Sequence, residues 1–499
     1  MRADTVVIGA GAAGATIAAR MTEDGRHEVL LLEAGPDYPE EIPSDLRNGT
    51  RNSMKAHDWG FHHLPTREQP PFVFPRGKVV GGSTAVNTCI ALRGEPYDYN
   101  EWELDDWRWE RCEPAFRRLE RDLDYGDRDY HGADGPIPIR RHPHDELTPW
   151  QAAFLEACET LGFARCDDSN EPGTTGYGPH AMNKVDGQRM SAALGYLDAK
   201  TRARSNLRIV AGVLVRRILF DGKRVRGVEI ERNGAVETVA TERVVLSAGS
   251  IGTPGVLLRS GVGSAEDVAR IGVALVAENP WVNKHLLDHP GCAIFLLPQP
   301  GVAEDTHLIQ NVLRYKSRRN RQRNDMILQP GSFVPLPVGD TMLVSLMAAI
   351  GKPRGAGWLR YESADPHAKP RIHSEFLRDP DDLDMAMEAM ELAWLLATST
   401  PMRSMARCLM PTERGLVSRE AMRSWIYKQT GSGYHPCGTV PMGSSAAKGA
   451  TDSRGRVFGV EGLIVADASL YPTVPSCNIN VPTLMLGERF GEWLRDGDL

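Results

Sequence analysis

Few cysteines occur in this sequence, and none of them forms a recognisable metal or redox motif. The chain has 499 residues but only eight cysteines, and no two are spaced as C-x-x-C. This pattern argues against a zinc ribbon and a thioredoxin-like pair, so we expect no bound metal. Scattered thiols in so long a chain are typical of a reducing compartment, and the sequence therefore predicts a cytoplasmic protein.

Long hydrophobic runs are missing as well. No apolar stretch reaches the roughly 18 residues of a membrane-spanning helix, and the opening residues, MRAD, lead directly into a buried strand pattern. We therefore expect neither a membrane span nor a signal peptide. Positive charge is not in excess, because the net charge is −7, and this argues against nucleic acid as a partner. A small-molecule substrate is expected instead.

Glycines are concentrated near the start of the chain. In TVVIGAGAAGATIAARM a β-branched run precedes Gly9, Gly11 and Gly14, and an alanine-rich segment follows them. This order of strand, glycine turn and helix is the arrangement in which backbone amides bind a dinucleotide pyrophosphate. The next apolar run ends at Glu33, where an acid can accept hydrogen bonds from a ribose. The segment predicts an adenine dinucleotide and leaves NAD and FAD both open.

A second glycine-rich loop favours FAD over NAD. The sequence PRGKVVGGSTAVNTCIALRG, residues 75–94, combines Gly77, Gly81 and Gly82 with short polar side chains. A dehydrogenase that uses only NAD has no obvious need for such a loop. A flavin nucleotide does, because its pyrophosphate and its ring both need backbone donors at close range.

The segment GSGYHPCGTVPMG, residues 431–443, places one histidine among glycines and prolines. A histidine pKa near ~6.5 permits proton transfer close to neutral pH. Pro436 biases His435 toward extended backbone, and the glycines let the chain pass close to a flat ring. His435 is therefore a candidate base for removing the proton of an alcohol. An isolated histidine would more often be a buried structural residue bonded to a carbonyl.

Four segments together resemble the glucose-methanol-choline (GMC) oxidoreductases. They are the loop at 75–94, AGSIGTPGVLLRSGVG at 248–263, VNKHLLDHP at 282–290 and the C-terminal block at 433–494. The third segment departs from the family, because Asn283 and His285 stand where glycine and asparagine are usual. The resemblance covers nearly the whole chain in the family order. It is specific for the family and much less so for the substrate.

The resemblance implies an α/β fold with two interleaved domains. The larger would be a discontinuous, Rossmann-like FAD-binding domain of residues 1–135, 195–290 and 427–499. The smaller would be an α+β substrate-binding domain of residues 136–194 and 291–426, built on an antiparallel sheet. Some relatives bond FAD to a histidine of the first loop, but Val86 stands at that position here. We therefore expect FAD to be bound non-covalently.

The resemblance also assigns roles to individual residues. His435 would be the catalytic base as hydride passes to flavin N5, and Asn478, aligned through PTLMLGE, would orient the alcohol and stabilise its alkoxide. His285 and His289 would support structure. The cofactor-binding residues that it implies are Gly9, Gly11, Ala12, Ala13, Gly14, Glu33, Ala34, Arg76, Val80, Gly81, Gly82, Ser83, Asn87, Thr88, Cys89, Ile90, Val215, Ala248, Gly249, Asp467, Ala468, Asn480, Pro482 and Thr483.

The implied activity is oxidation of an alcohol, most often a primary alcohol, to an aldehyde or ketone, with O₂ or another acceptor reoxidising the flavin. Choline is not favoured, because no aromatic cage for a quaternary ammonium can be recognised. A hydroxynitrile lyase of the same fold, which keeps FAD without net redox chemistry, is the alternative. A photodecarboxylase of the family is disfavoured because those enzymes lack the histidine found at His435.

Overall fold

The first strand lies in the middle of a parallel sheet. In the computed structural model, which describes residues 2–303, 307–319, 321–335, 342–412 and 418–499, β1 (Thr5–Ile8) pairs with β2 (Val29–Leu32) and β14 (Arg243–Leu246). The outer strands are β10 (Leu207–Val210) beside β2 and β25 (Leu463–Val465) beside β14. All four pairings are parallel, and the central strands are mostly apolar because both faces of the sheet are covered.

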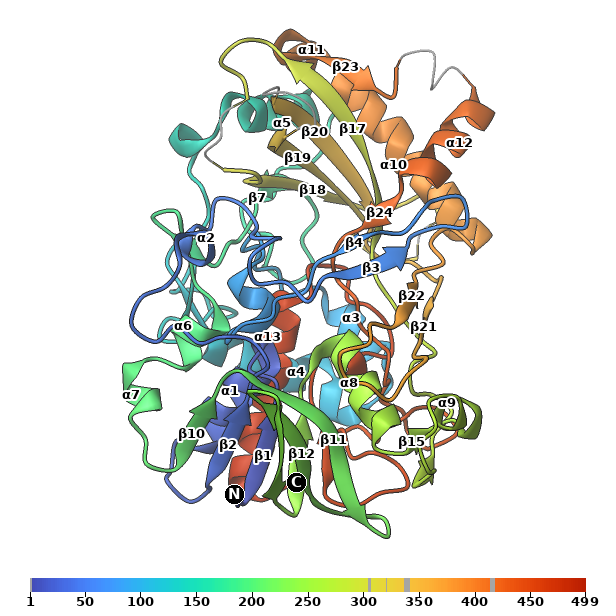
Figure 1. The fold of residues 1–499 in the computed structure, drawn as a ribbon. Helices are drawn as coiled ribbons and strands as arrows, with labels where there is room; N and C mark the ends of the chain where they lie inside the picture. Colours follow the sequence, from blue (N-terminus) through green and yellow to red (C-terminus); the bar gives the residue numbers. More distant parts are fainter. Residues whose placement is uncertain (1, 304–306, 320, 336–341, 413–417) are drawn as a thin grey trace.

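Helices α1 (Ala12–Met21) and α13 (Asn480–Asp496) pack side by side against this sheet (Figure 1). Glycines allow the close approach: a Cβ on Gly487 would lie 2.8 Å from Thr16, and one on Gly491 would lie 2.6 Å from Arg20. Because these contacts advance in the same direction along both helices, the helices run parallel. Their N-termini therefore face the same edge of the molecule, as does the turn after β1.

An antiparallel sheet of β11 (Val213–Asp221), β12 (Arg224–Arg232) and β13 (Ala235–Ala240) lies beside the parallel sheet. The Asp221-Gly222 turn joins β11 to β12, and Gly222 supplies the positive φ of +58° that the turn requires. At its start, β11 runs beside the chain that follows β2, because the Val213 amide donates to Glu33 O at 2.9 Å.

The second large sheet is antiparallel and forms the upper part of Figure 1. Its strand order is β23-β17-β20-β19-β18-β7, with β24 paired to the start of β17. Helices α5 (Pro149–Thr160) and α10 (Pro380–Thr398) cover it, and α10 buries Met385, Met387 and Met390 against it. The bounds are β7 (Gly176–Pro179), β17 (Pro290–Pro298), β18 (Asn311–Tyr315), β19 (Met326–Pro335), β20 (Met342–Ile350), β23 (Ala406–Met410) and β24 (Gly431–Ser432).

Shorter elements connect these sheets. The helices are α2 (Ser44–Arg47), α3 (Pro96–Asn100), α4 (Trp109–Leu119), α6 (Ala192–Tyr196), α7 (Ala199–Arg202), α8 (Gly249–Arg259), α9 (Ala265–Arg270), α11 (Thr400–Met405) and α12 (Arg419–Gln429). The strands are β3 (Phe61–Leu64), β4 (Phe72–Phe74), β5 (Glu120–Asp122), β6 (Ile137–Ile139), β8 (Lys184–Val185), β9 (Gln188–Arg189), β15 (Val262–Gly263), β16 (Ala277–Glu278), β21 (Trp358–Arg360) and β22 (Arg371–His373).

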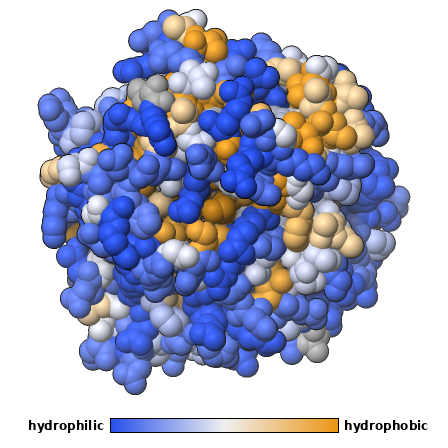
Figure 2. Space-filling model, turned by 90° about the horizontal axis from the view of Figure 1, so that it is seen from below, coloured by the Kyte–Doolittle hydropathy of each residue, from blue (hydrophilic) through white to orange (hydrophobic). Residues whose placement is uncertain are grey.

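Within the described ranges, no helix combines the length and the apolar character needed to cross a bilayer. Figure 2 shows the face seen from below, which is largely hydrophilic and carries its hydrophobic residues in separate small patches. A large continuous apolar surface, which would mark an extensive contact, is not seen on this face.

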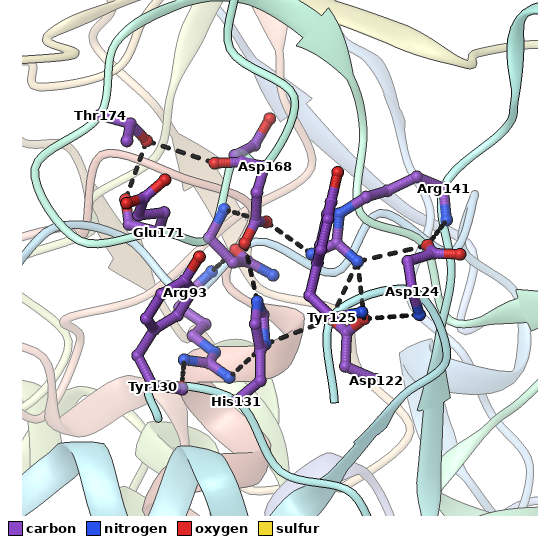
Figure 3. Close-up of polar contacts among 12 residues, drawn as sticks. Arg93, Asp122, Asp124, Tyr125, Tyr130, His131, Arg141, Asp168, Glu171 and Thr174 are labelled. Atoms are coloured by element: carbon purple, nitrogen blue, oxygen red, sulfur yellow. Dashed lines mark hydrogen bonds and ion pairs between the residues drawn. The ribbon is translucent and has the colours of Figure 1, made fainter. Parts of the chain in front are cut away.

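A buried ionic cluster ties β5 to the segment after α5 (Figure 3). The His131 ring lies between two carboxylates, with Nδ1 2.7 Å from Glu120 Oε1 and Nε2 2.7 Å from Asp168 Oδ2. Because carboxylate oxygens accept hydrogen bonds, both ring nitrogens must carry protons and the ring must be cationic. Burial lowers the pKa of His131, but the bonds to Asp168 and Glu120 outweigh burial and leave the pKa above its usual value.

The same cluster offers a set of atoms that could hold a metal ion. Ligand atoms of Glu120, Asp122 and His131 all lie within 4.8 Å of one another. Arg93 is already paired with Glu120, however, and Arg141 Nη1 donates to Asp122 at 2.9 Å. Since these guanidinium groups already neutralise the carboxylates, the arrangement is better explained as a buried ion network than as a metal centre.

Candidate active site

The glycine turn after β1 forms the floor of the site. Gly9 has a φ of +96°, and a Cβ there would lie 2.4 Å from Ser247 O, so only glycine fits. Gly14 is equally restricted, because a Cβ would lie 1.9 Å from Gly9 O. Gly11 differs from both: an added Cβ would approach only Gly82 Cα, at 3.9 Å, within the described chain. Space above Gly11 is therefore open, as the approach of a pyrophosphate requires.

Glu33 holds this turn in place. Its carboxylate accepts hydrogen bonds from the Ala10 amide at 2.9 Å and from the Gly35 amide at 2.8 Å. Burial raises the pKa of Glu33, and these backbone donors oppose the shift. Each carboxylate oxygen retains a second acceptor position, so the group can still bind a ribose hydroxyl. Ala34 lies between Glu33 and Gly35, inside the turn that the Gly35 bond closes.

The first signature loop docks directly onto the glycine turn. The Gly81 amide donates to Ala10 O at 2.7 Å, and Gly81 has a φ of +100°. A Cβ on Gly82 would lie 2.7 Å from Gly11 Cα. The two glycine-rich segments, far apart in the sequence, thus build one backbone cradle. Of the other predicted loop residues, Val80 donates its amide to Pro36 O, Ser83 accepts from the Gly77 amide, and Asn87 accepts from the Cys89 amide.

Two further segments face this cradle with polar groups. Asp467 accepts from the Gly249 amide at 2.8 Å, which fixes the turn from Ala248 into α8. The N-terminus of α13 carries Asn480, whose buried Nδ2 has no partner in the part of the chain that the structure describes. An unsatisfied buried donor at a helix N-terminus is a favourable place for a polar ligand atom. The donor set therefore fits a flavin nucleotide.

The remaining predicted cofactor residues lie in three places. One group lies in β11, after β25 and in the first turn of α13, and consists of Val215, Ala468, Pro482 and Thr483. Thr483 Oγ1 lies 3.0 Å from the Tyr471 hydroxyl. Cys89 and Ile90 are buried in an apolar cluster with Cys477, next to Asn478, and Thr88 precedes them. Arg76 lies beside the histidine loop, where its Nη2 donates to Tyr434 O at 2.9 Å.

The structure brings His435 and Asn478 together. Asn478 Nδ2 lies 3.0 Å from His435 Nε2, and the other ring nitrogen, Nδ1, lies 2.8 Å from His289 Nδ1. His435 is also held through its backbone, since its amide donates to Asp288 Oδ1 at 2.9 Å. An asparagine, two histidines and an aspartate from three separate segments thus form one connected group.

The hydrogen-bond partners determine which ring nitrogens carry protons. His289 Nε2 faces two carbonyls, Pro475 O at 2.9 Å and Gly351 O at 3.1 Å, so it must be the N–H donor. The unprotonated Nδ1 of His289 then accepts from His435 Nδ1. In neutral His435 this leaves the lone pair on Nε2, where the Asn478 amide donates to it. A lone pair exposed to a neighbouring donor in this way can accept the proton of an alcohol.

Burial keeps both imidazoles neutral. It lowers the pKa of His289 to about 4. It also lowers the pKa of His435 well below its usual value, with further contributions from His289 and Arg76. The pKa of Asp288 moves the other way, raised by burial to about 6. His435 is therefore in the unprotonated state that a base requires across the physiological pH range.

The partnership of His289 with His435 was not recognisable in the sequence, although the DHP segment itself was. Both histidines belong to family-like motifs, but nothing in either motif shows that their rings meet. The available signal was the position of His289 directly before the apolar run that begins at Pro290 and forms β17. Asp288 was also missed: it accepts from the backbone amides of His289 and His435 and bonds the Ser432 hydroxyl.

Together, a Rossmann-like dinucleotide cradle and a histidine–asparagine pair define a nucleotide-dependent oxidoreductase. The family model of the GMC oxidoreductase N-terminal part matches residues 3–291, and that of the C-terminal part matches residues 353–487. The chain belongs to the GMC oxidoreductase family, whose members are FAD flavoproteins, and it is an enzyme of the class that acts on CH–OH groups.

Relatives agree with this assignment over nearly their full length. The chain is 32% identical to 5-(hydroxymethyl)furfural oxidase of Methylovorus sp. (strain MP688), covering 98% of each protein. It is also 32% identical to oxygen-dependent choline dehydrogenase of Rhizobium etli (strain CIAT 652), covering 98% of the chain and 95% of that protein. The crystal structure of pyridoxine 4-oxidase from Mesorbium loti matches with a TM-score of 0.91 and 27% identity, covering 98% of both chains.

Proposed function

We propose that this protein oxidises a primary alcohol to the corresponding aldehyde, with His435 as the base. The observation that carries the proposal is the unprotonated His435 Nε2, whose lone pair accepts from the Asn478 amide while His289 holds the opposite ring nitrogen. An alcohol hydroxyl that takes the place of this direct bond can donate its proton to His435 Nε2 and accept a hydrogen bond from Asn478 Nδ2. The developing negative charge on that oxygen is then stabilised by the amide donor.

FAD, when bound, supplies the two-electron acceptor for this oxidation. The groups that would hold it are the backbone of the turn at Gly11, the Gly81-Gly82 segment and the Asn480 side chain. Non-covalent binding is proposed, because Val86 offers no nucleophile at the position where some relatives carry a histidine. If that is correct, acid or heat denaturation of the yellow protein releases all of its flavin into the filtrate. Flavin retained on the denatured chain would contradict it.

The charges around the base favour an uncharged substrate. Besides burial, His289 and the cationic Arg76 lower the pKa of His435, and the positive charge of Arg76 also disfavours a cationic substrate beside the base. A quaternary ammonium is usually held by aromatic rings or by an acidic group. Choline is therefore a poorer candidate than neutral alcohols such as 5-(hydroxymethyl)furfural and pyridoxine, which the names of two relatives mention.

No structural feature favours the hydroxynitrile lyase alternative, and the relatives named above are oxidases or dehydrogenases. The electron acceptor that completes the cycle is proposed to be O₂ or another small acceptor. One experiment addresses substrate and acceptor together. The flavin-loaded protein is mixed without oxygen with 5-(hydroxymethyl)furfural, pyridoxine and choline in turn, and loss of the flavin absorbance is recorded.

Bleaching by the neutral alcohols is expected, with little or none by choline at equal concentration. Air or a redox dye is then admitted, and the faster recovery of colour identifies the acceptor. A protein that stays oxidised with every alcohol, or that bleaches with choline alone, would contradict the proposal. Cyanohydrin cleavage without any bleaching would support the lyase instead.

A further inference from the structure

A buried lysine lies directly behind the Asn478 loop. Lys352 follows β20 and is 7% exposed. Its Nζ donates to Val474 O at 2.7 Å and to Thr473 Oγ1 at 3.3 Å, and both acceptors belong to the loop that leads to Asn478. A charged ammonium aimed at a backbone carbonyl makes a stronger bond than a neutral donor does. Lys352 therefore restrains this loop from behind.

Asp98, on α3, completes the restraint. This carboxylate is fully buried and lies 3.1 Å from Lys352 Nζ. It also accepts from the Ser476 hydroxyl at 2.7 Å and from Gln322 Nε2 at 3.0 Å. Burial alone raises the pKa of Asp98, but Lys352 and these donors outweigh burial and lower it. The ion pair is therefore charged on both sides, and it holds the loop at Val474 and at Ser476.

This lysine is connected to both carbonyls that hold His289. Pro475 O follows Val474, whose carbonyl Lys352 binds, and Gly351 O belongs to the residue immediately before Lys352. Displacement of either carbonyl would remove the acceptor that keeps the proton on His289 Nε2. If His289 carried its proton on Nδ1 instead, two N–H groups would face each other across the His289–His435 contact. His435 would then have to carry its own proton on Nε2. The base would then be blocked.

We propose that Lys352 is a positioning residue for alcohol oxidation, which holds Pro475 O and Gly351 O so that His289 keeps its Nε2 proton and His435 Nε2 stays unprotonated. This inference rests on the proposed role of His435 as base. Lys352 touches neither the reacting atoms nor the dinucleotide cradle, so it acts only through the loop and through His289. Its positive charge also disfavours a second proton on His289, because the two groups interact electrostatically.

The titratable groups around this network come from several elements. They are Glu95, Asp98 and Glu101 at α3, Asp288 and His289 before β17, Arg321 after β18, His435 and Cys437 after β24, Cys477 in the catalytic loop and Arg76 beside Asp288. The cysteine thiols are neutral, because burial raises the pKa of Cys437 and Cys477 well above the usual value. Lys352 acts most directly on Asp98, and it also lowers the pKa of His289, the imidazole that bonds His435.

Lys352→Met, which removes the ammonium but keeps a chain of similar length, tests the proposal in the flavin-loaded protein. Anaerobic flavin bleaching by a saturating neutral alcohol is followed from acid to alkaline pH. We expect the rate at neutral pH to fall by roughly tenfold or more, within the range of general-base effects. We also expect the acidic limb of the pH profile to move to higher pH, while the alcohol concentration for half-saturation changes little.

A second variant and a matched control separate this role from simple loss of stability. Lys352→Met combined with Asp98→Asn removes both charges of this pair, and the other acid at Lys352, Glu101, keeps its bond from the Thr473 hydroxyl. Arg20→Met is the control: Arg20 also pairs with a fully buried acid, Glu488, but Arg118 still neutralises that acid and the pair lies at the far end of α1. The control is expected to bleach at the unaltered rate and with the unaltered pH profile.

Nitrogen NMR of histidine-labelled protein supplies a readout that does not depend on turnover. In the unaltered protein we expect His289 to remain neutral, with its proton on Nε2, between about pH 5 and pH 9. In the Lys352 variants we expect a mixture of tautomers or a titration of His289 within that interval. If no alcohol bleaches even the unaltered protein, the proposed function fails, and these spectra still report on His289.

The outcomes are decisive in either direction. A folded Lys352 variant with an unaltered acidic limb and an unaltered His289 signal would overturn the inference, even if its rate fell. So would an unaltered protein in which His289 carries its proton on Nδ1 or titrates near neutral pH. If both variants fail to retain flavin while Arg20→Met retains it, the spectra of the unaltered protein decide.

Discussion

His435→Ala tests the base assignment most directly. The substitution removes the imidazole but keeps the backbone contacts of the loop, since the amide of residue 435 still donates to Asp288 and the Gly438 amide to Ala468 O. The dinucleotide cradle involves neither contact, so FAD binding should be retained. Loss of general-base help corresponds to roughly 10²–10⁴ in rate, or about 3–5 kcal/mol of activation free energy.

Rapid mixing without oxygen measures this loss as the rate of flavin bleaching at saturating alcohol. The rate should fall by that factor, while the flavin spectrum and flavin content stay unchanged. His367→Ala, at an exposed histidine that pairs with Glu231, is a suitable control and should bleach normally. A His435→Ala protein that retains flavin and bleaches within a few fold of the unaltered rate would refute the assignment, including the tautomer argument built on His289.

Three further predictions concern other parts of the molecule. Asn478→Ala should slow bleaching by roughly tenfold, less than His435→Ala, because one hydrogen bond to a developing charge is lost while the base remains; equal losses would contradict the division of roles. Gly11→Ala should fold but bind FAD more weakly in an equilibrium titration, since its Cβ enters the open cradle, whereas Gly14→Ala should fail to fold because its Cβ meets Gly9 O. The free energy of unfolding should decrease as pH rises from ~6.5, the unfolded pKa of histidine, through the elevated pKa of His131, because only the protonated ring stabilises the fold. His131→Gln should lack this pH dependence, and denaturant titrations at a series of pH values from ~6.5 upward measure it.

The parts of the fold that the sequence predicts are those with local patterns. The first βαβ unit, its glycine turn and Glu33 are contiguous, and the hairpin at Asp221-Gly222 is marked by its turn residues. The parallel order of β10, β2, β1, β14 and β25 is not visible locally, because those strands come from four distant stretches of chain. Resemblance to a family, rather than periodicity, predicted that they combine into one sheet.

Much of the candidate site shows the same division. Motif alignment pointed to His435 and Asn478, and the structure places their side chains in contact. The residues behind them were not predicted: His289 was expected to be structural, and Lys352 and Asp98 carry no motif at all. A buried lysine is unremarkable in a sequence, because its function follows from which carbonyls surround it. That information exists only after the chain has folded.

The continuity of β17 has a consequence for engineering. This strand begins one residue after His289, pairs at that end with β24 just before His435, and then runs on into the antiparallel sheet. Chimeras that exchange the upper sheet between relatives to change substrate preference would need a crossover in this region. A junction at residue 290 would take β17 from one relative and His289 from the other, so the strand and this histidine should come from the same protein.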